Sequence, residues 1–127
     1  MCGIAGFWNP KGGSLPLAAT ACAMGDAIRH RGPDGHGEIA WPEQGLALAH
    51  RRLAIIDLTE AGRQPMASAS GRWTIVFNGE IYNYLVVRRE IELARGGFAW
   101  RGHSDTEVLV EALEAWGPEG TLLRSDG

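Results

Sequence analysis

The stretch that decides the fold runs from residue 36 to residue 57 and reads HGEIAWPEQGLALAHRRLAIID. Residues 36–41 and 45–57 are rich in apolar side chains, and the turn-forming sequence Pro42–Gln44 separates them. Two strands joined by so short a turn pair in antiparallel fashion. The stretch therefore predicts an antiparallel hairpin within a sheet.

Two further apolar runs predict additional strands. Residues 3–8 form a short apolar run that Asn9-Pro10 ends, as expected of a buried strand. Residues 72–78 carry apolar side chains at consecutive positions, which predicts a strand whose two faces are both covered.

Helical spacing appears twice before residue 100. Apolar residues recur every three or four positions over residues 17–29 and again over residues 84–94. Asn83 is expected to cap the second helix at its start, and Gly96-Gly97 is expected to end it.

A third helix is predicted after residue 103. Ser104, with Glu107 three positions later, forms a capping-box pattern, and Gly117-Pro118 is expected to end the helix. The resulting order is strand, helix, several strands, helix, helix. This order indicates an α+β fold in which helices pack outside antiparallel sheet.

Length and composition limit the possible functions. The 127 residues are expected to form one domain, 1–127, and such a chain buries roughly two thirds of its unfolded surface. Hydrophobic residues make up 45% and charged residues 21%, which is typical of a globular protein. The net charge of −3, with no basic stripe, argues against nucleic acid and anionic membranes as partners. No run approaches the roughly 18 apolar residues of a membrane helix, and the first residues do not resemble a signal peptide. Two cysteines are too few for a disulfide scaffold, which favours a reducing cytoplasm.

Cys2 is the most informative residue of the chain. If the initiator Met1 is removed, the thiol of Cys2 lies beside its own free amine. An α-amino group titrates near about 7.7–8.0, so it can act as a general base without a histidine. The same residue then supplies both nucleophile and base. The alternative from position alone is a small residue at a frayed chain end.

Three other positions suggest parts of an active site, each with a plainer alternative. Asn78-Gly79 places a side-chain amide beside an exposed backbone N–H, which suits an oxyanion hole, although Asn-Gly is also a hairpin-turn sequence. Arg52 at a strand end is suited to clamp a carboxylate, or is a solvated charge. Asp105 is suited to accept from a substrate ammonium, or is an acidic residue favoured in the first turn of a helix.

Five sequence blocks in order make the set specific. Together they resemble the glutaminase domain of the glutamine-hydrolysing asparagine synthetase family, a class II glutamine amidotransferase of the N-terminal nucleophile hydrolase type. The block with Arg-His-Arg-Gly-Pro-Asp-Gly is the one that points to this branch. The blocks are Met1–Gly6, Arg29–Gly35, His50–Asp57, Phe77–Asn83 and Ser104–Val108.

The resemblance implies a fold and a role for each matching residue. The implied fold is a four-layer αββα sandwich of antiparallel sheets, truncated at its C-terminus in this chain. Cys2 would be the nucleophile, and Asn78 with Gly79 would form the oxyanion hole. Arg52 would hold the glutamine α-carboxylate. The α-amino group would be held by Asp105 together with backbone groups near two further residues, Ile56 and Glu80. The block at 29–35 is expected to support the pocket structurally.

The implied reaction releases ammonia from the side chain of glutamine through a Cys2 thioester. In the family, that ammonia reaches a C-terminal synthetase domain, where ATP and Mg²⁺ activate aspartate. The resemblance implies no metal and no cofactor for the glutaminase domain itself, and a homodimer is possible.

The chain departs from the family pattern at residue 127, where family members continue into further strands. Three alternatives therefore stay open: a truncated and inactive domain that serves only in interactions, an amidotransferase for another carboxylate acceptor, and redox sensing by Cys2 and Cys22.

Overall fold

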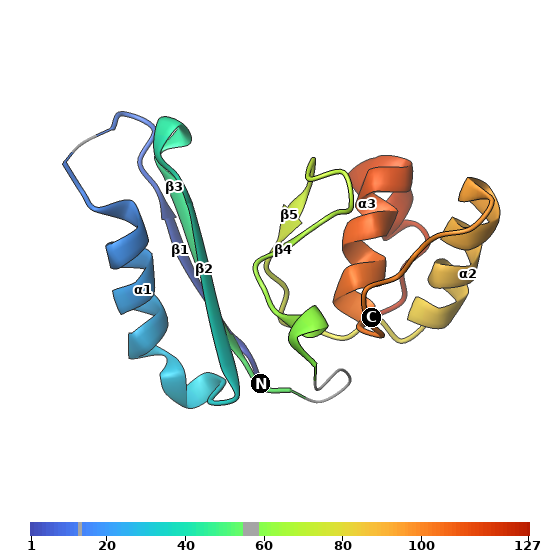
Figure 1. The fold of residues 1–127 in the computed structure, drawn as a ribbon, viewed down its shortest axis with the longest axis horizontal. Helices are drawn as coiled ribbons and strands as arrows, with labels where there is room; N and C mark the ends of the chain where they lie inside the picture. The colour runs from blue at the N-terminus through green and yellow to red at the C-terminus, as the bar shows by residue number, and fades with distance from the viewer. Residues whose placement is uncertain (13, 55–58) are drawn as a thin grey trace. The chain divides into compact units, whose positions relative to one another are not determined.

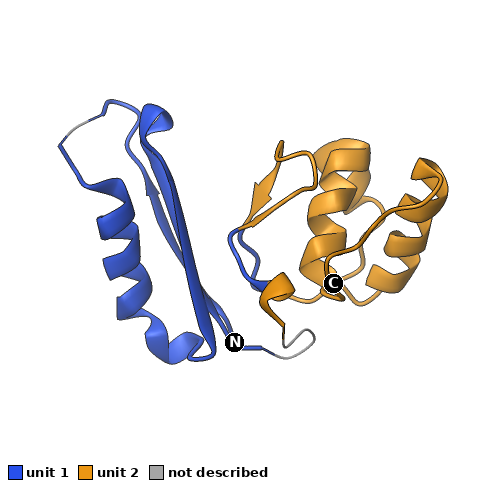
Figure 2. Cartoon of the chain, viewed as in Figure 1, with its two compact units in different colours: residues 1–55, 63–65, 76–78 blue, residues 56–62, 66–75, 79–127 orange. Residues whose placement is uncertain are grey.

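The computed structural model describes residues 1–12, 14–54 and 59–127, and the chain forms two compact units. Unit 1 comprises residues 1–55, 63–65 and 76–78, and unit 2 comprises residues 56–62, 66–75 and 79–127 (Figure 2). Both units combine helices with antiparallel strands, so the expected mixed class of α and β structure is confirmed.

Unit 1 is an antiparallel sheet with one helix against it (Figure 1). The strand order is β1-β3-β2, where β1 is Gly3–Trp8, β2 is Gly35–Trp41 and β3 is Leu46–Arg52. The predicted hairpin is confirmed as β2 and β3, which a single turn of 3₁₀ helix, η2 (Pro42–Gln44), connects. The second strand is shorter than predicted, since it ends at residue 52; residues 55–57 lie outside the described residues.

The helix of unit 1, α1 (Leu17–Ala27), covers one face of the sheet. The buried contacts join Ala21 of α1 to Ala47 and Ala49 of β3. Because side chains alternate between the faces of a strand, odd-numbered residues of β3 face α1 and even-numbered residues point away. The helix ends two residues earlier than predicted, and a 3₁₀ turn, η1 (Arg29–Arg31), follows it.

Unit 2 consists of a helix pair and a short strand pair. Helix α2 is Tyr84–Arg95 and helix α3 is Asp105–Leu122. They pack through a core of four buried apolar residues, with three half-buried aromatic residues against it. The buried residues are Val87, Ile91, Val108 and Ala112, and the aromatic residues are Tyr84, Trp100 and Trp116. The strands β4 (Met66–Ala67) and β5 (Thr74–Ile75) pair beside α3, and a 3₁₀ turn, η3 (Glu60–Gly62), precedes them.

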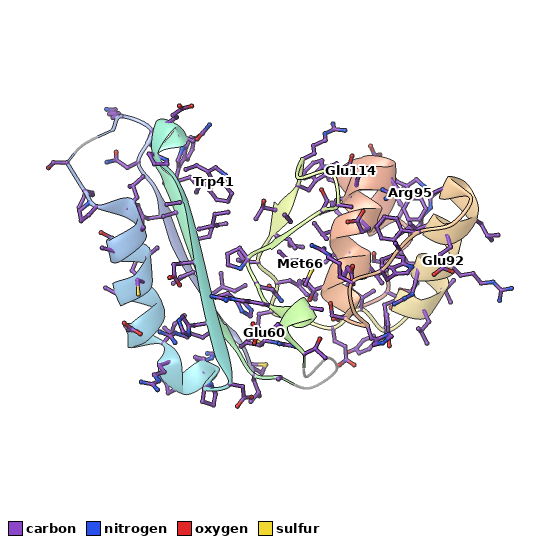
Figure 3. The ribbon with its side chains drawn as sticks, viewed as in Figure 1. Trp41, Glu60, Met66, Glu92, Arg95 and Glu114 are labelled. Carbon is purple, nitrogen blue, oxygen red and sulfur yellow. The ribbon has the colours of Figure 1, made fainter. Side chains whose placement is uncertain are left out.

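Polar side chains tie the parts of unit 2 together. The carboxylate of Glu111, which is fully buried, accepts from the Ala69 backbone at 2.6 Å and from Arg95 at 3.0 Å. Glu114 on α3 accepts from Ser70 at 2.7 Å, so both carboxylates anchor the β4–β5 hairpin on the helix. Figure 3 labels Arg95 on α2 and Glu114 on α3.

The prediction of one strand over residues 72–78 is wrong. Only residues 74–75 are paired, because Gly71 has a positive φ of 75° and the Trp73 N–H donates to Ser68 rather than to a strand. Beyond β5, the Phe77 N–H donates to the side chain of Gln64. The apolar character of the segment reflects packing against two different units, not a long strand.

Two predictions about helix ends also need correction. Asn83 stands at the N-cap of α2 but makes no capping hydrogen bond; its amide instead donates to the Arg124 carbonyl at 2.7 Å and accepts from Asp126 at 2.9 Å. Helical structure does not end at Gly117-Pro118. The backbone kinks at Gly117 (φ 70°, ψ 177°), and a further helical turn starts after the kink, where proline is favoured.

Other helix signals are confirmed. Gly96 takes the left-handed conformation that ends α2, and the Ser104 hydroxyl accepts from the Glu107 N–H at 3.1 Å to cap α3. None of the helices in the described part of the chain combines the length and hydropathy that a membrane span requires.

Candidate active site

Cys2 directly precedes β1, and its thiol lies against the chain that leaves β3. The Leu53 backbone N–H donates to Cys2 Sγ at 3.3 Å, and Sγ lies 3.6 Å from the Leu53 carbonyl oxygen. The side chain is half-buried. The sulfur is thus held in one place by backbone groups of unit 1 while part of it stays accessible.

The strand register separates the two consecutive arginines of β3. Arg51 pairs with Gly3 and faces α1, where its guanidinium donates to the Gly25 carbonyl at 3.0 Å and pairs with Asp26. Arg52 is one position further, so its side chain leaves the opposite face of the sheet. Cys2, one residue before Gly3, leaves this same face. The arginine proposed as a clamp is therefore the one that shares a face with the cysteine.

The block at residues 29–35 has a role that the sequence did not show. The Asp34 N–H donates to the Arg52 carbonyl at 3.0 Å, and its carboxylate accepts from the Ala54 N–H at 3.0 Å. A side chain at Gly32 would collide with the backbone of Arg51, so only glycine allows this close approach. The block therefore fixes the chain on either side of Leu53, the residue that contacts Cys2. The turn chemistry of Pro33-Asp34-Gly35 was the available signal.

The predicted oxyanion residues Asn78 and Gly79 are exposed and consecutive, and the boundary between the two units falls between them. Asn78 belongs to unit 1 through its neighbour Phe77, whose N–H donates to Gln64 Oε1 at 2.6 Å. Gly79 opens the segment of unit 2 that leads to α2.

A buried histidine lies on the same sheet face as Arg52. His50 is 1% exposed, and neither ring nitrogen reaches a hydrogen-bond partner. Burial lowers the pKa of His50, the charge of Arg52 lowers it further, and the backbone of Phe77 opposes both effects. The ring is therefore neutral at pH 7. Sequence reasoning did not single out His50 or Gln64, since their roles depend on contacts between distant segments.

Asp105 is buried at the start of α3 and already has backbone partners. One carboxylate oxygen accepts from the Ile81 N–H at 3.0 Å, and the other accepts from the Thr106 N–H at 2.8 Å. The carboxylate thereby holds the turn that contains Glu80, which is itself exposed. The expectation that Asp105 and Glu80 act together thus has a geometric basis within unit 2. Ile56, the remaining predicted contact, lies outside the described residues.

The predicted residues thus form two groups. Cys2, Arg52 and Asn78 belong to unit 1, and Gly79, Glu80 and Asp105 belong to unit 2. Within the described ranges, no three His, Cys, Asp or Glu side chains are arranged to hold a metal ion. Cys2 and Cys22 are both free thiols.

An antiparallel-sheet domain that holds a cysteine at residue 2 against a backbone amide, beside an arginine, has the form of a cysteine-dependent acyl-transfer site. The family comparison agrees with this class. The family model described as "Glutamine amidotransferase domain" matches residues 1–127, and the chain belongs to this family.

Curated relatives carry asparagine synthetase names. The chain is 39% identical over 118 residues to "Asparagine synthetase [glutamine-hydrolyzing] 3" of Bacillus subtilis, covering 91% of this chain and 18% of that protein. It is 40% identical over 116 residues to "Asparagine synthetase [glutamine-hydrolyzing] 1" of the same organism, covering 87% and 17%. "Asparagine synthetase B [glutamine-hydrolyzing]" of Escherichia coli is 34% identical over 119 residues, covering 94% and 20%. The chain therefore spans about a fifth of the length of these relatives.

Proposed function

We propose that this domain hydrolyses the side-chain amide of glutamine to glutamate and ammonia, with Cys2 as the nucleophile. The observation that carries the proposal is the placement of Cys2 Sγ, 3.3 Å from the Leu53 N–H, on the sheet face that Arg52 shares. The glutamine amidotransferase family supports glutamine as the substrate.

The reaction would proceed in two acyl-transfer steps. After removal of Met1, the Cys2 amine takes the thiol proton, and the sulfur attacks the amide carbon of glutamine. Asn78 and Gly79 stabilise the tetrahedral oxyanion, and loss of one such donor typically costs about 10²–10³ in rate. The amine then passes the proton to the departing ammonia, which leaves a thioester. Water hydrolyses the thioester to glutamate and regenerates the thiol.

The substrate would be held at its amino-acid end by charge. Arg52 binds the α-carboxylate through paired N–H donors, and Asp105, with backbone groups near Ile56 and Glu80, binds the α-ammonium. The backbone bonds of Asp105 support this role because they fix the carboxylate and the turn at Glu80 together. These assignments need no metal ion or cofactor in the domain.

We further propose that residues 1–127 form part of a glutaminase domain with the four-layer αββα arrangement. The sheet of unit 1 supports this, since α1 covers only one of its faces. The other face carries apolar side chains such as Trp8, which is 70% exposed, and Trp41, which points away from α1 (Figure 3).

In the full-length protein, ammonia would serve ATP- and Mg²⁺-dependent synthesis of asparagine from aspartate in a C-terminal synthetase domain. The names of the relatives support this acceptor. We place the protein in the cytoplasm, possible homodimers included, and mass measurement in solution tests the dimer.

The test measures glutamate release from glutamine by the full-length protein whose mass shows loss of Met1. We expect Cys2→Ala to abolish release while ammonia-dependent synthesis continues, and Cys22→Ala to behave as wild type. Glutamate release that persists in Cys2→Ala would refute the proposal.

A further inference from the structure

Gln64 is a buried polar residue that joins separate segments of unit 1. It lies between η3 and β4, is 6% exposed, and accepts the Phe77 N–H on Oε1 at 2.6 Å. A hydrogen bond this short, to a buried side chain, fixes the position of the donor. Phe77 immediately precedes Asn78, so Gln64 determines where the segment that presents Asn78 is placed within unit 1.

The main chain of Gln64 is in turn seated on the sheet. A Cβ at Gly37 of β2 would collide with the Gln64 carbonyl, so the two backbones approach as closely as glycine permits. Gly37 is the register partner of His50, on the sheet face that points away from α1. Gln64 is therefore held against this face by its backbone and reaches Phe77 with its side chain.

His50 completes the contact from the central strand. It is almost fully buried and interacts with the Phe77 backbone. Its neutral ring fills this position without adding positive charge beside Arg52. The segment at 76–78 is thus held by a hydrogen bond from Gln64 and by contact with the strand that also carries Arg52.

We propose that Gln64 is a positioning residue for the oxyanion hole: it holds Phe77, and through the next peptide unit Asn78, in place relative to the sheet face that carries Cys2. This inference rests on the proposed roles of Cys2 and Asn78. Misplacement of a catalytic group by about 1 Å costs on the order of 10²-fold in rate, so loss of the Gln64 acceptor affects catalysis without any contact to substrate.

The experiment compares Gln64→Leu with Gln64→Glu in the full-length protein. Leu removes the acceptor, whereas Glu keeps an acceptor oxygen in either protonation state. The matched control is Gln44→Leu, the same replacement at the exposed end of η2. We expect Gln64→Leu to lower kcat for glutamine hydrolysis roughly 10- to 100-fold with KM changed less than about twofold. Gln64→Glu is expected to restore most of the activity.

A second readout isolates the oxyanion hole. A glutamine analogue with an aldehyde in place of the amide forms a tetrahedral adduct with the Cys2 thiol, and its affinity reports oxyanion stabilisation. We expect Gln64→Leu to weaken this inhibitor by about the factor lost in kcat, while glutamate binds as in wild type. An unchanged inhibitor affinity, or an effect on KM alone, would overturn the inference.

Hydrogen exchange of the wild-type protein gives a test that does not depend on a folded variant or on activity. The Phe77 amide is expected to be protected, and Gln64→Leu is expected to remove that protection. Fast exchange at Phe77 in the wild type would overturn the inference. If instead the wild type is protected but does not hydrolyse glutamine, the proposed function fails while the contact itself stands.

Discussion

Replacement of Arg51 and Arg52 one at a time should separate substrate binding from stability. The two residues are neighbours with the same side chain, but the register directs them to opposite faces of the sheet. Arg52→Ala removes the proposed carboxylate clamp. A hydrogen bond to a charged group contributes about 1.5–3 kcal/mol, which corresponds to a rise in KM of roughly 10- to 100-fold. Since the clamp acts equally on bound substrate and transition state, kcat should change little.

Arg51→Ala should have the opposite profile. Its guanidinium is 9% exposed and donates to the Gly25 carbonyl, so removal leaves this acceptor unpaired at a cost of about 1–3 kcal/mol. The ion pair adds little to this figure because the Asp26 side chain is 63% exposed. Hydrogen exchange of α1 and β3 amides should accelerate roughly 5- to 150-fold while KM stays unchanged.

Steady-state glutaminase kinetics and hydrogen exchange on the full-length protein measure both effects on the same samples. The reasoning fails if Arg51→Ala raises KM as much as Arg52→Ala does. It fails equally if Arg52→Ala speeds exchange in α1 and leaves KM alone, because either result means that the faces have been assigned in reverse.

Two further outcomes follow from contacts of unit 1. Asp34→Ala removes the acceptor of the Ala54 N–H and loosens the backbone that holds Cys2, so kcat should fall on the order of 10-fold, whereas Glu43→Ala on the exposed η2 turn should have no effect; equal kcat values in the two variants would contradict this. Because the folded-state pKa of His50 is lowered by burial, the unfolded chain takes up the proton first, so the stability of unit 1 is complete above about pH 6.5 and declines as the pH falls below it. Urea unfolding at pH 7.5 and pH 5.5 should show this loss in wild type and a smaller loss in His50→Leu, and identical losses would show that another group titrates.

The sequence was most informative where local patterns determine structure. The hairpin over 36–52 and the end of α2 at Gly96 follow from turn chemistry and from the conformational freedom of glycine. The segment at 72–78 was predicted as one strand because its apolar residues are consecutive. Its backbone partners are Ser68 and Gln64, which lie in separate segments, and a local pattern does not contain that information.

The same limit explains which residues near the site were missed. Asp34 and Gln64 act by accepting backbone N–H groups 20 and 13 positions away. Side chains of this kind have no characteristic spacing, because their partners are set by how strands and loops pack. Cys2 was apparent because its proposed chemistry depends on one residue alone, the thiol and its own amine.

Asp105 shows why a structural and a catalytic role need not compete. As an acidic residue in the first turn of α3 it is explained by the helix dipole, and its two oxygens accept the Ile81 and Thr106 N–H groups. An ionised carboxylate offers about four lone-pair positions, so two backbone donors leave positions for a substrate ammonium. The backbone bonds also keep the carboxylate ionised and fix its orientation before substrate arrives. The helix start thus supplies the rigidity that an amino-acid binding group requires.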